Sequence, residues 1–244
     1  MHAMKAIGAA IYHDHDLAED ATPLLRLIDT LAAGAADLRL FCVPLAPRRE
    51  ASTEFVREKL IARISGGALA SALVETAPTT PAGDSLAITV TLQAPAQPAG
   101  YRYELGVALG ETFVARRSLA AIVDEVLAFA GAVDARAGAI FPAETAAYAY
   151  SLAVGGVAGD LTEAQARRAK DVFYDVHELG DRARAPEWGN ILGRHHAREL
   201  AAARVQDVIV RELPRGGAYV QLTPDPTDAS LDAKRATLAA SWRA

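Results

Sequence analysis

Few residues in this sequence are of the kinds that identify a chemistry by themselves. There is one cysteine, Cys42, and it lies in an apolar run. A single cysteine excludes an intrachain disulfide and a cysteine-based metal site within one chain. We interpret Cys42 as a small buried hydrophobic residue, the usual role of an unpaired cysteine, and not as a nucleophile.

The sequence also shows no segment with the pattern of a membrane-spanning helix or of a signal peptide. No window holds 18 uninterrupted apolar residues, so the sequence predicts no membrane-spanning helix and no membrane partner. Near the start, Lys5 precedes a short apolar run that the polar residues 13–16 interrupt at once, which is not the pattern of a signal peptide. These two observations lead us to expect a cytoplasmic protein.

The sequence has no excess of basic charge. Its formal net charge is −5 and its pI is about 5.7, whereas proteins that bind nucleic acids usually present a basic surface. We therefore expect no nucleic-acid partner. An acidic protein can still mask a basic protein partner through charge complementarity.

The segment that most resembles a metal site is His13-Asp14-His15-Asp16. If the preceding strand continues through it, the two histidines share one face and the two aspartates the other. A transition-metal site needs three or four converging ligands, and the sequence indicates no others. We interpret the segment as a polar strand end and expect neither metal nor cofactor. The alternative is an enzyme whose site combines His13, His15 and distant acidic residues.

The glycine-rich segment 155–159 does not match a phosphate-binding motif. It lacks the Lys-Ser/Thr pair of a P-loop, and its glycines do not have the GxGxxG spacing. We interpret it as a flexible linker. Because no catalytic motif has its usual spacing, we expect that the protein is not an enzyme.

Two segments, 86–92 and 101–109, alternate apolar and polar residues, which indicates two strands that pair antiparallel. The order of predicted elements lacks strict βαβ alternation. We therefore predict an α+β fold, with a mainly antiparallel mixed sheet flanked by helices. We expect one domain over residues 1–244; if it divides into two α/β subdomains, the boundary falls near 154–160.

Helix starts are marked by capping residues. Thr22 precedes a proline at the first helical position. Ser52 or Thr53 is expected to cap a second helix, with Ile61 on its buried stripe, and Ser118 is expected to cap a third.

The stretch 186–228 has the most distinctive order of elements. Trp188 lies in a short turn, and Gly189 and Gly193 bracket an extended segment. Good helix formers follow over 195–203.

A hairpin completes this stretch. A strand is predicted over 205–213, and the turn at Gly216 and Gly217 can supply the positive φ angles of a tight hairpin. The return strand, 218–223, alternates apolar and polar residues, so we expect one apolar and one polar face.

This order resembles the C-terminal part of bacterial immunity proteins of polymorphic-toxin and type VI secretion systems. The stretch covers about a fifth of the chain. Glu187 departs from the pattern, because a glycine is commoner before the aromatic residue. The residues that carry the likeness, with expected structural roles, are those of the turn and hairpin: Trp188, Gly189, Gly193, Gly216 and Gly217.

The resemblance implies a protein that binds and neutralises a cognate secreted toxin, of nuclease type, by direct contact and without chemistry of its own. Carboxylates in loops could then mimic nucleic-acid phosphates. The candidates for such contacts are Asp14, Asp16, Asp225 and Asp228. A third hypothesis, a structural or assembly component, predicts a stable homo-oligomer formed through apolar strand edges.

Overall fold

The computed structural model describes residues 4–35, 37–44, 52–67, 69–77, 79–92, 101–154, 161–177, 186–194, 196 and 207–242. The strands are β1 (Ala6–His13), β2 (Leu38–Pro44), β3 (Thr53–Glu54), β4 (Leu69–Thr76), β5 (Leu86–Leu92), β6 (Tyr103–Gly110), β7 (Ala137–Ala143), β8 (Gly189–Leu192), β9 (Ile209–Glu212) and β10 (Ala218–Gln221). The helices are α1 (Thr22–Leu31), α2 (Arg57–Ser65), α3 (Glu111–Arg117), α4 (Leu119–Ala132), α5 (Ala146–Val154), α6 (Glu163–His177) and α8 (Leu231–Trp242).

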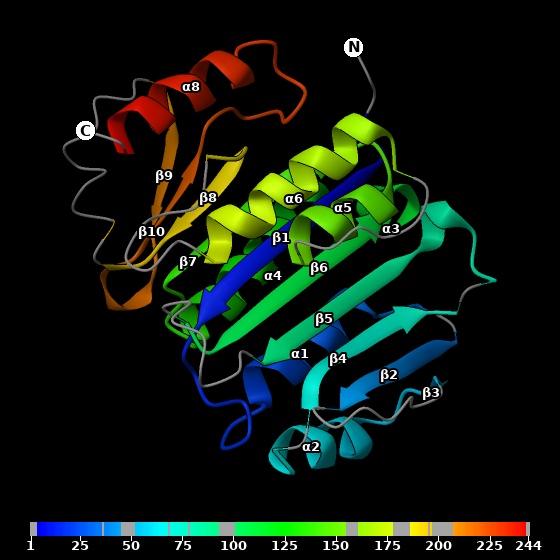
Figure 1. Ribbon diagram of the computed structural model, residues 1–244. Helices are drawn as coiled ribbons and strands as arrows, with labels where there is room; N and C mark the ends of the chain where they lie inside the picture. The colour runs from blue at the N-terminus through cyan, green and yellow to red at the C-terminus, as the bar shows by residue number, and fades with distance from the viewer. Residues whose placement is uncertain are drawn as a thin grey trace.

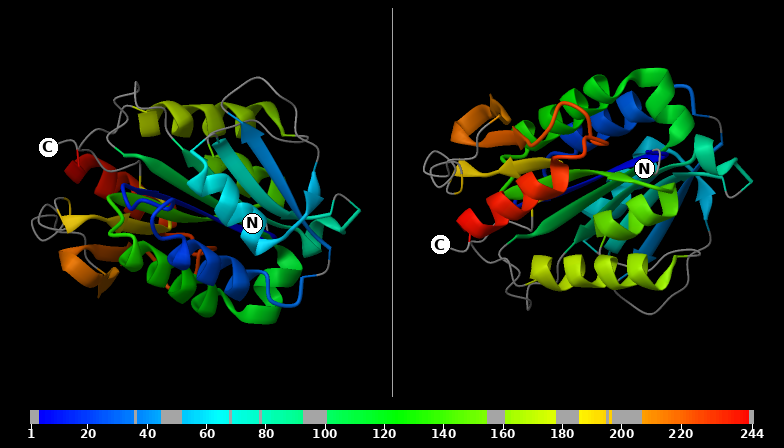
Figure 2. Two further views of the ribbon diagram at one scale, coloured as in Figure 1. Left: turned by 90° about the horizontal axis from the view of Figure 1, so that it is seen from below. Right: turned by 90° about the horizontal axis from the view of Figure 1, so that it is seen from above.

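The ten strands form one sheet in the order β3-β2-β4-β5-β6-β1-β7-β8-β10-β9 (Figure 1). All of its pairings are antiparallel. Helices cover both faces: α1 and α4 lie on one side and α6 on the other (Figure 2). The predicted α+β class with an antiparallel sheet is therefore confirmed.

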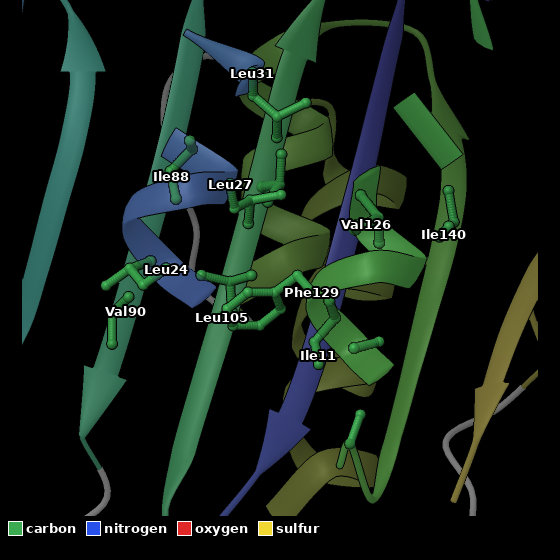
Figure 3. Close-up of a cluster of buried hydrophobic side chains, with 14 of the residues drawn as sticks. Ile11, Leu24, Leu27, Leu31, Ile88, Val90, Leu105, Val126, Phe129 and Ile140 are labelled. Atoms are coloured by element: carbon green, nitrogen blue, oxygen red, sulfur yellow. The ribbon is translucent and has the colours of Figure 1, made fainter. Parts of the chain in front are cut away.

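The first strand, β1, lies in the middle of the sheet and is buried on both faces. All eight of its residues are buried, and it pairs with β6 on one side and β7 on the other. Its odd-numbered residues, such as Ile7 and Ile11, enter the larger core under α1 and α4. Figure 3 shows side chains that meet there: Ile11, Leu24, Leu27, Leu31, Ile88, Val90, Leu105, Val126, Phe129 and Ile140.

The opposite face of β1 carries small residues. Ala6 and Ala10 lie in a second core beneath α5, and α6 packs outside that helix. A Cβ atom added at Gly8 would overlap the Phe141 ring and lie 3.0 Å from the Ala149 carbonyl oxygen. The absence of a side chain at Gly8 is what allows α5 to lie this close to the sheet.

Several local predictions are confirmed. Segments 86–92 and 101–109 contain β5 and β6, which pair antiparallel as predicted. Helix α1 begins at Thr22, followed by proline, and buries its apolar stripe. The Ser118 side chain accepts a hydrogen bond at the start of α4, and Cys42 is buried in the larger core.

The predicted cap at Ser52 or Thr53 is wrong. Thr53 belongs to the short edge strand β3, which pairs with β2. Helix α2 follows Val56, whose backbone is extended, and Ile61 is 36% exposed and not part of the buried stripe. Strand β4 and helix α3 were not predicted.

The polar face of the return strand is buried and does not lie in solvent. Tyr219, Gln221 and Thr223 are all buried. Their polar atoms find partners nearby, because the Tyr219 hydroxyl donates to Gln221 Oε1 at 3.3 Å and Gln221 Nε2 donates to the Thr223 carbonyl oxygen at 2.9 Å. This pairing lets a polar face be buried without unsatisfied groups.

The hairpin turn has two positive φ angles, at Arg215 (64°) and Gly216 (86°), whereas Gly217 is extended. The Gly-rich segment 155–160 and most of the predicted helix 195–203 lie outside the described residues.

Candidate functional site: a polar hollow at the end of the central strand

A hollow of about 530 Å³ opens where β1 ends. Its walls come from four separate parts of the chain: the residues after β1, the turn between α4 and β7, the residues after β8, and Arg215 in the hairpin turn. The lining residues are Asp14, His15, Val133, Asp134, Ala135, Arg136, Gly193, Arg194, His196 and Arg215.

Opposite charges face each other across this hollow. The Asp14 carboxylate accepts a hydrogen bond from Arg136 Nε and another from the Arg102 backbone N–H, the latter at 2.9 Å. Arg215 lies 3.6 Å from Asp134. Arg194 is exposed and makes neither a hydrogen bond nor an ion pair with any described residue. The hollow therefore contains three guanidinium groups and two carboxylates.

Asp16, the second predicted contact at this end, is fixed by hydrogen bonds. It accepts from Arg102 Nη1 at 2.6 Å, the Tyr103 hydroxyl at 2.9 Å and the Ala18 backbone N–H at 2.9 Å. Partial burial opposes ionisation, yet these hydrogen bonds together hold the pKa of the Asp16 carboxyl below its ordinary value. Asp14 and Asp16 are thus paired carboxylates and not free acidic side chains.

His13 lies in the core behind the hollow. It is 0% exposed, stacks on Tyr103 with the ring centroids 5.4 Å apart, and meets the edge of Phe129 at 5.7 Å. Neither ring nitrogen has a hydrogen-bond partner among the described residues. Burial, helped by the nearby His15, lowers the pKa of His13 to about 3, so the ring is neutral at physiological pH.

This arrangement does not assemble a metal site. Strand β1 ends at His13, so the expected alternation does not continue through the segment, and the His13 and His15 rings lie 6.4 Å apart. Over the described ranges, no three or more His, Cys, Asp or Glu side chains are grouped closely enough to hold an ion.

The two remaining acidic candidates lie at the other end of the sheet. Asp228 lines a second hollow, of about 400 Å³, together with Met4 and Ala143. Ala143 pairs with Ala6, the first residue of β1, so roughly 25 Å of strand separates this hollow from Asp14. The structure therefore does not bring the four acidic candidates together.

Asp225 and Asp228 each close a local turn. Asp225 Oδ1 accepts from the Thr227 backbone N–H and hydroxyl at 2.8 and 2.7 Å, and Asp228 Oδ1 accepts from both groups of Ser230 at 2.7 Å. These hydrogen bonds hold the pKa of both carboxyl groups below the usual value. Both side chains are exposed.

The turn at Trp188 is tied to the end of β10. Trp188 is buried, and its indole N–H donates to the Thr223 carbonyl oxygen at 2.8 Å. Asn190 accepts from the Glu187 backbone N–H at 2.8 Å and donates to the Glu187 carbonyl oxygen at 2.9 Å. Gly189 begins β8, and the Gly193 N–H donates to the Arg136 carbonyl oxygen at 2.8 Å, at the edge of the hollow.

Glu187, the residue that departs from the family pattern, is the centre of a buried ion-pair cluster that the sequence did not predict. Its side chain is 4% exposed. It accepts from Arg168 of α6 at 3.0 Å on both oxygens and from Arg235 of α8 at 2.7 Å. The cluster fastens two helices to the Trp188 turn.

The arginines of the hollow were also missed. No local pattern connects Arg136, Arg194 and Arg215, because they come from separate segments of the sequence. The only sequence signal for the Glu187 cluster was its occurrence where glycine is commoner.

Comparison with known proteins gives one informative result. No protein-family model matches the chain, and no curated protein matches it. Among solved structures, the Pseudomonas aeruginosa T6SS protein PA0821 is similar, with a TM-score of 0.62 and 13% identity over 98% of this chain and 73% of that protein. The two share a fold.

At this level of identity the likeness describes the fold alone.

None of the helices in the described ranges is long and apolar enough to cross a membrane.

Proposed function

We propose that this protein is a type VI secretion immunity protein that binds a cognate toxin and neutralises it by direct contact. The observation that carries the proposal is the likeness to a T6SS protein over 98% of the chain. The family resemblance of residues 186–228 supports it independently, because it rests on local sequence and not on overall fold.

The chemistry of the polar hollow suits recognition better than catalysis. His13 is neutral and sealed in the core, so it has no route to a substrate. Asp14 and Asp16 already accept hydrogen bonds from arginine, which makes them poor general bases. Paired and unpaired charges at a surface hollow instead favour selective association with a complementary protein surface.

The two acidic pairs lie at opposite ends of β1 and are tested separately as toxin contacts.

Co-expression with the toxin encoded beside this gene tests the proposal. We expect cells to survive and the two proteins to co-purify as a 1:1 complex, whereas the toxin alone kills. Death of the co-expressing cells, with no complex on size-exclusion chromatography, would refute the proposal. A stoichiometric transition metal in the purified protein would favour the enzyme alternative.

The choice between the two ends can be made with the same complex. The double change Asp225→Ala and Asp228→Ala removes two exposed carboxylates and should slow association if that end meets a basic toxin surface. Exchange of Asp14 for Asn serves the same purpose at the other end. Association rates measured at two salt concentrations distinguish the ends.

A further inference from the structure

We propose that the polar hollow binds an acidic segment of the partner protein, with Arg194 as the principal donor to its carboxylate. This inference rests on the proposed function and gives the chemistry of the contact. Here an arginine of this protein binds a negative charge on the partner, whereas the acidic candidates above would bind positive charges on it.

The first support is local charge. The whole protein has a formal net charge of −5, yet this hollow contains the guanidinium groups of Arg136, Arg194 and Arg215 against the carboxylates of Asp14 and Asp134. Among the described lining residues, one positive charge has no carboxylate opposite it. A cationic hollow in an acidic protein is a site that an anion can enter with a favourable interaction.

The second support is that the three arginines differ in whether they already have a carboxylate partner among the described residues. Arg136 and Arg215 each already pair with a carboxylate, Asp14 and Asp134 respectively, so their charges are partly compensated. Arg194 has no hydrogen bond or ion pair in the described chain and is exposed. Its planar guanidinium can therefore offer two parallel N–H groups to an incoming carboxylate, the geometry that makes arginine–carboxylate pairs strong.

The third support is backbone geometry at the wall of the hollow. Asp134 and Arg215 face each other, and both have left-handed φ angles, 51° and 64°. Residues other than glycine adopt this conformation only occasionally. These two turns bring the end of α4 and the hairpin to the same hollow.

The character of the hollow favours a short acidic protein segment over nucleic acid. Its volume of about 530 Å³ lies within the range of ligand-sized hollows. Two carboxylates within it would repel a continuous phosphate backbone, which needs a basic track along several nucleotides. A single aspartate or glutamate side chain of the partner can approach Arg194 without coming close to the carboxylates of Asp14 and Asp134.

The decisive experiment measures affinity for the toxin by calorimetry with wild-type protein and two charge-reversal variants. Arg194→Glu should weaken binding at least tenfold, because a carboxylate would then face the partner's carboxylate. Arg26→Glu is the matched control, since Arg26 is an exposed arginine on α1 without a described partner. It should change the affinity less than twofold. Equal affinities for wild type and Arg194→Glu would overturn the inference and leave the proposed function standing.

A second arm decides the question if the wild-type protein binds no toxin. Hexaglutamate is titrated into ¹⁵N-labelled protein at low salt, with hexaglutamine as the neutral control. Shifts at Arg194 and its neighbours that Arg194→Glu abolishes and Arg26→Glu preserves would support an acid-binding hollow, although the immunity proposal had failed. Absence of such shifts, or their persistence in Arg194→Glu, would overturn the inference.

Discussion

The neutral, buried His13 should make the stability of this protein depend on pH in a way that one substitution removes. His13→Phe keeps an aromatic ring between Tyr103 and Phe129 and deletes the titrating group. The ring lies in an apolar site without hydrogen-bond partners in the described chain. We therefore expect the variant to fold, and to differ from wild type mainly in its response to acid.

The direction of this pH effect on stability follows from two pKa values of the histidine, in the unfolded and in the folded protein. The ordinary value is 6.5 and that of His13 in the folded protein is about 3. Between them the unfolded chain binds a proton that the native protein does not, so the free energy of unfolding falls as the pH drops below 6.5. At pH 5 the difference of about 1.5 pH units corresponds to roughly 2 kcal/mol relative to pH 7.

Urea unfolding followed by circular dichroism at pH 5, 6 and 7 measures this effect. Between pH 7 and pH 5, the wild type should lose about 2 kcal/mol more than His13→Phe. Phe129→Leu is the control, because it disturbs the same packing and leaves the histidine in place, so its curve should be offset without a change in slope. Parallel pH profiles for wild type and His13→Phe would refute the reasoning.

Three further substitutions test the packing, each by the urea midpoint at an unchanged m-value. Glu187→Gln removes the charge that two arginines share, and should destabilise the protein by about 2 to 3 kcal/mol, since one arginine is half exposed and can be partly solvated. Gly8→Ala places a methyl group in the Phe141 ring and should cost about 1 to 3 kcal/mol. Trp188→Phe deletes one buried hydrogen bond and should cost about 1 kcal/mol, because the Thr223 carbonyl oxygen keeps a second donor. A loss below 0.5 kcal/mol in any of these would contradict the packing described for that residue.

Local periodicity was enough to predict the elements whose pattern is short-range. Segments 86–92 and 101–109 alternate because one set of side chains enters the larger core, and their adjacency in sequence made the pairing predictable. The place of β1 between β6 and β7 was not predictable, because nothing local identifies partners that lie 90 or more residues away. The burial of the return strand's polar face was not predictable either, because its polar residues form hydrogen bonds with one another inside the protein.

The candidate site was predictable only in part. Asp14 and Asp16 were identified as notable, but their arginine partners lie about 90 and 120 residues later. Ion pairs between residues so far apart in sequence produce no local motif that the sequence could reveal. Glu187 was visible only as a departure from the family pattern, and its meaning came from two helices that converge on it.

The central position of β1 has a consequence for synthesis on the ribosome. Ala6 pairs with Gly110 and with Ala143, so the middle of the sheet cannot close until most of the first 143 residues have emerged. At typical elongation rates the gap of about a hundred residues lasts roughly 5 to 20 s. During that interval the apolar β1 has neither neighbour, although β2, β4 and β5 can already pair with one another. The polar hollow forms later still, because Gly193, Arg194 and Arg215 follow residue 143.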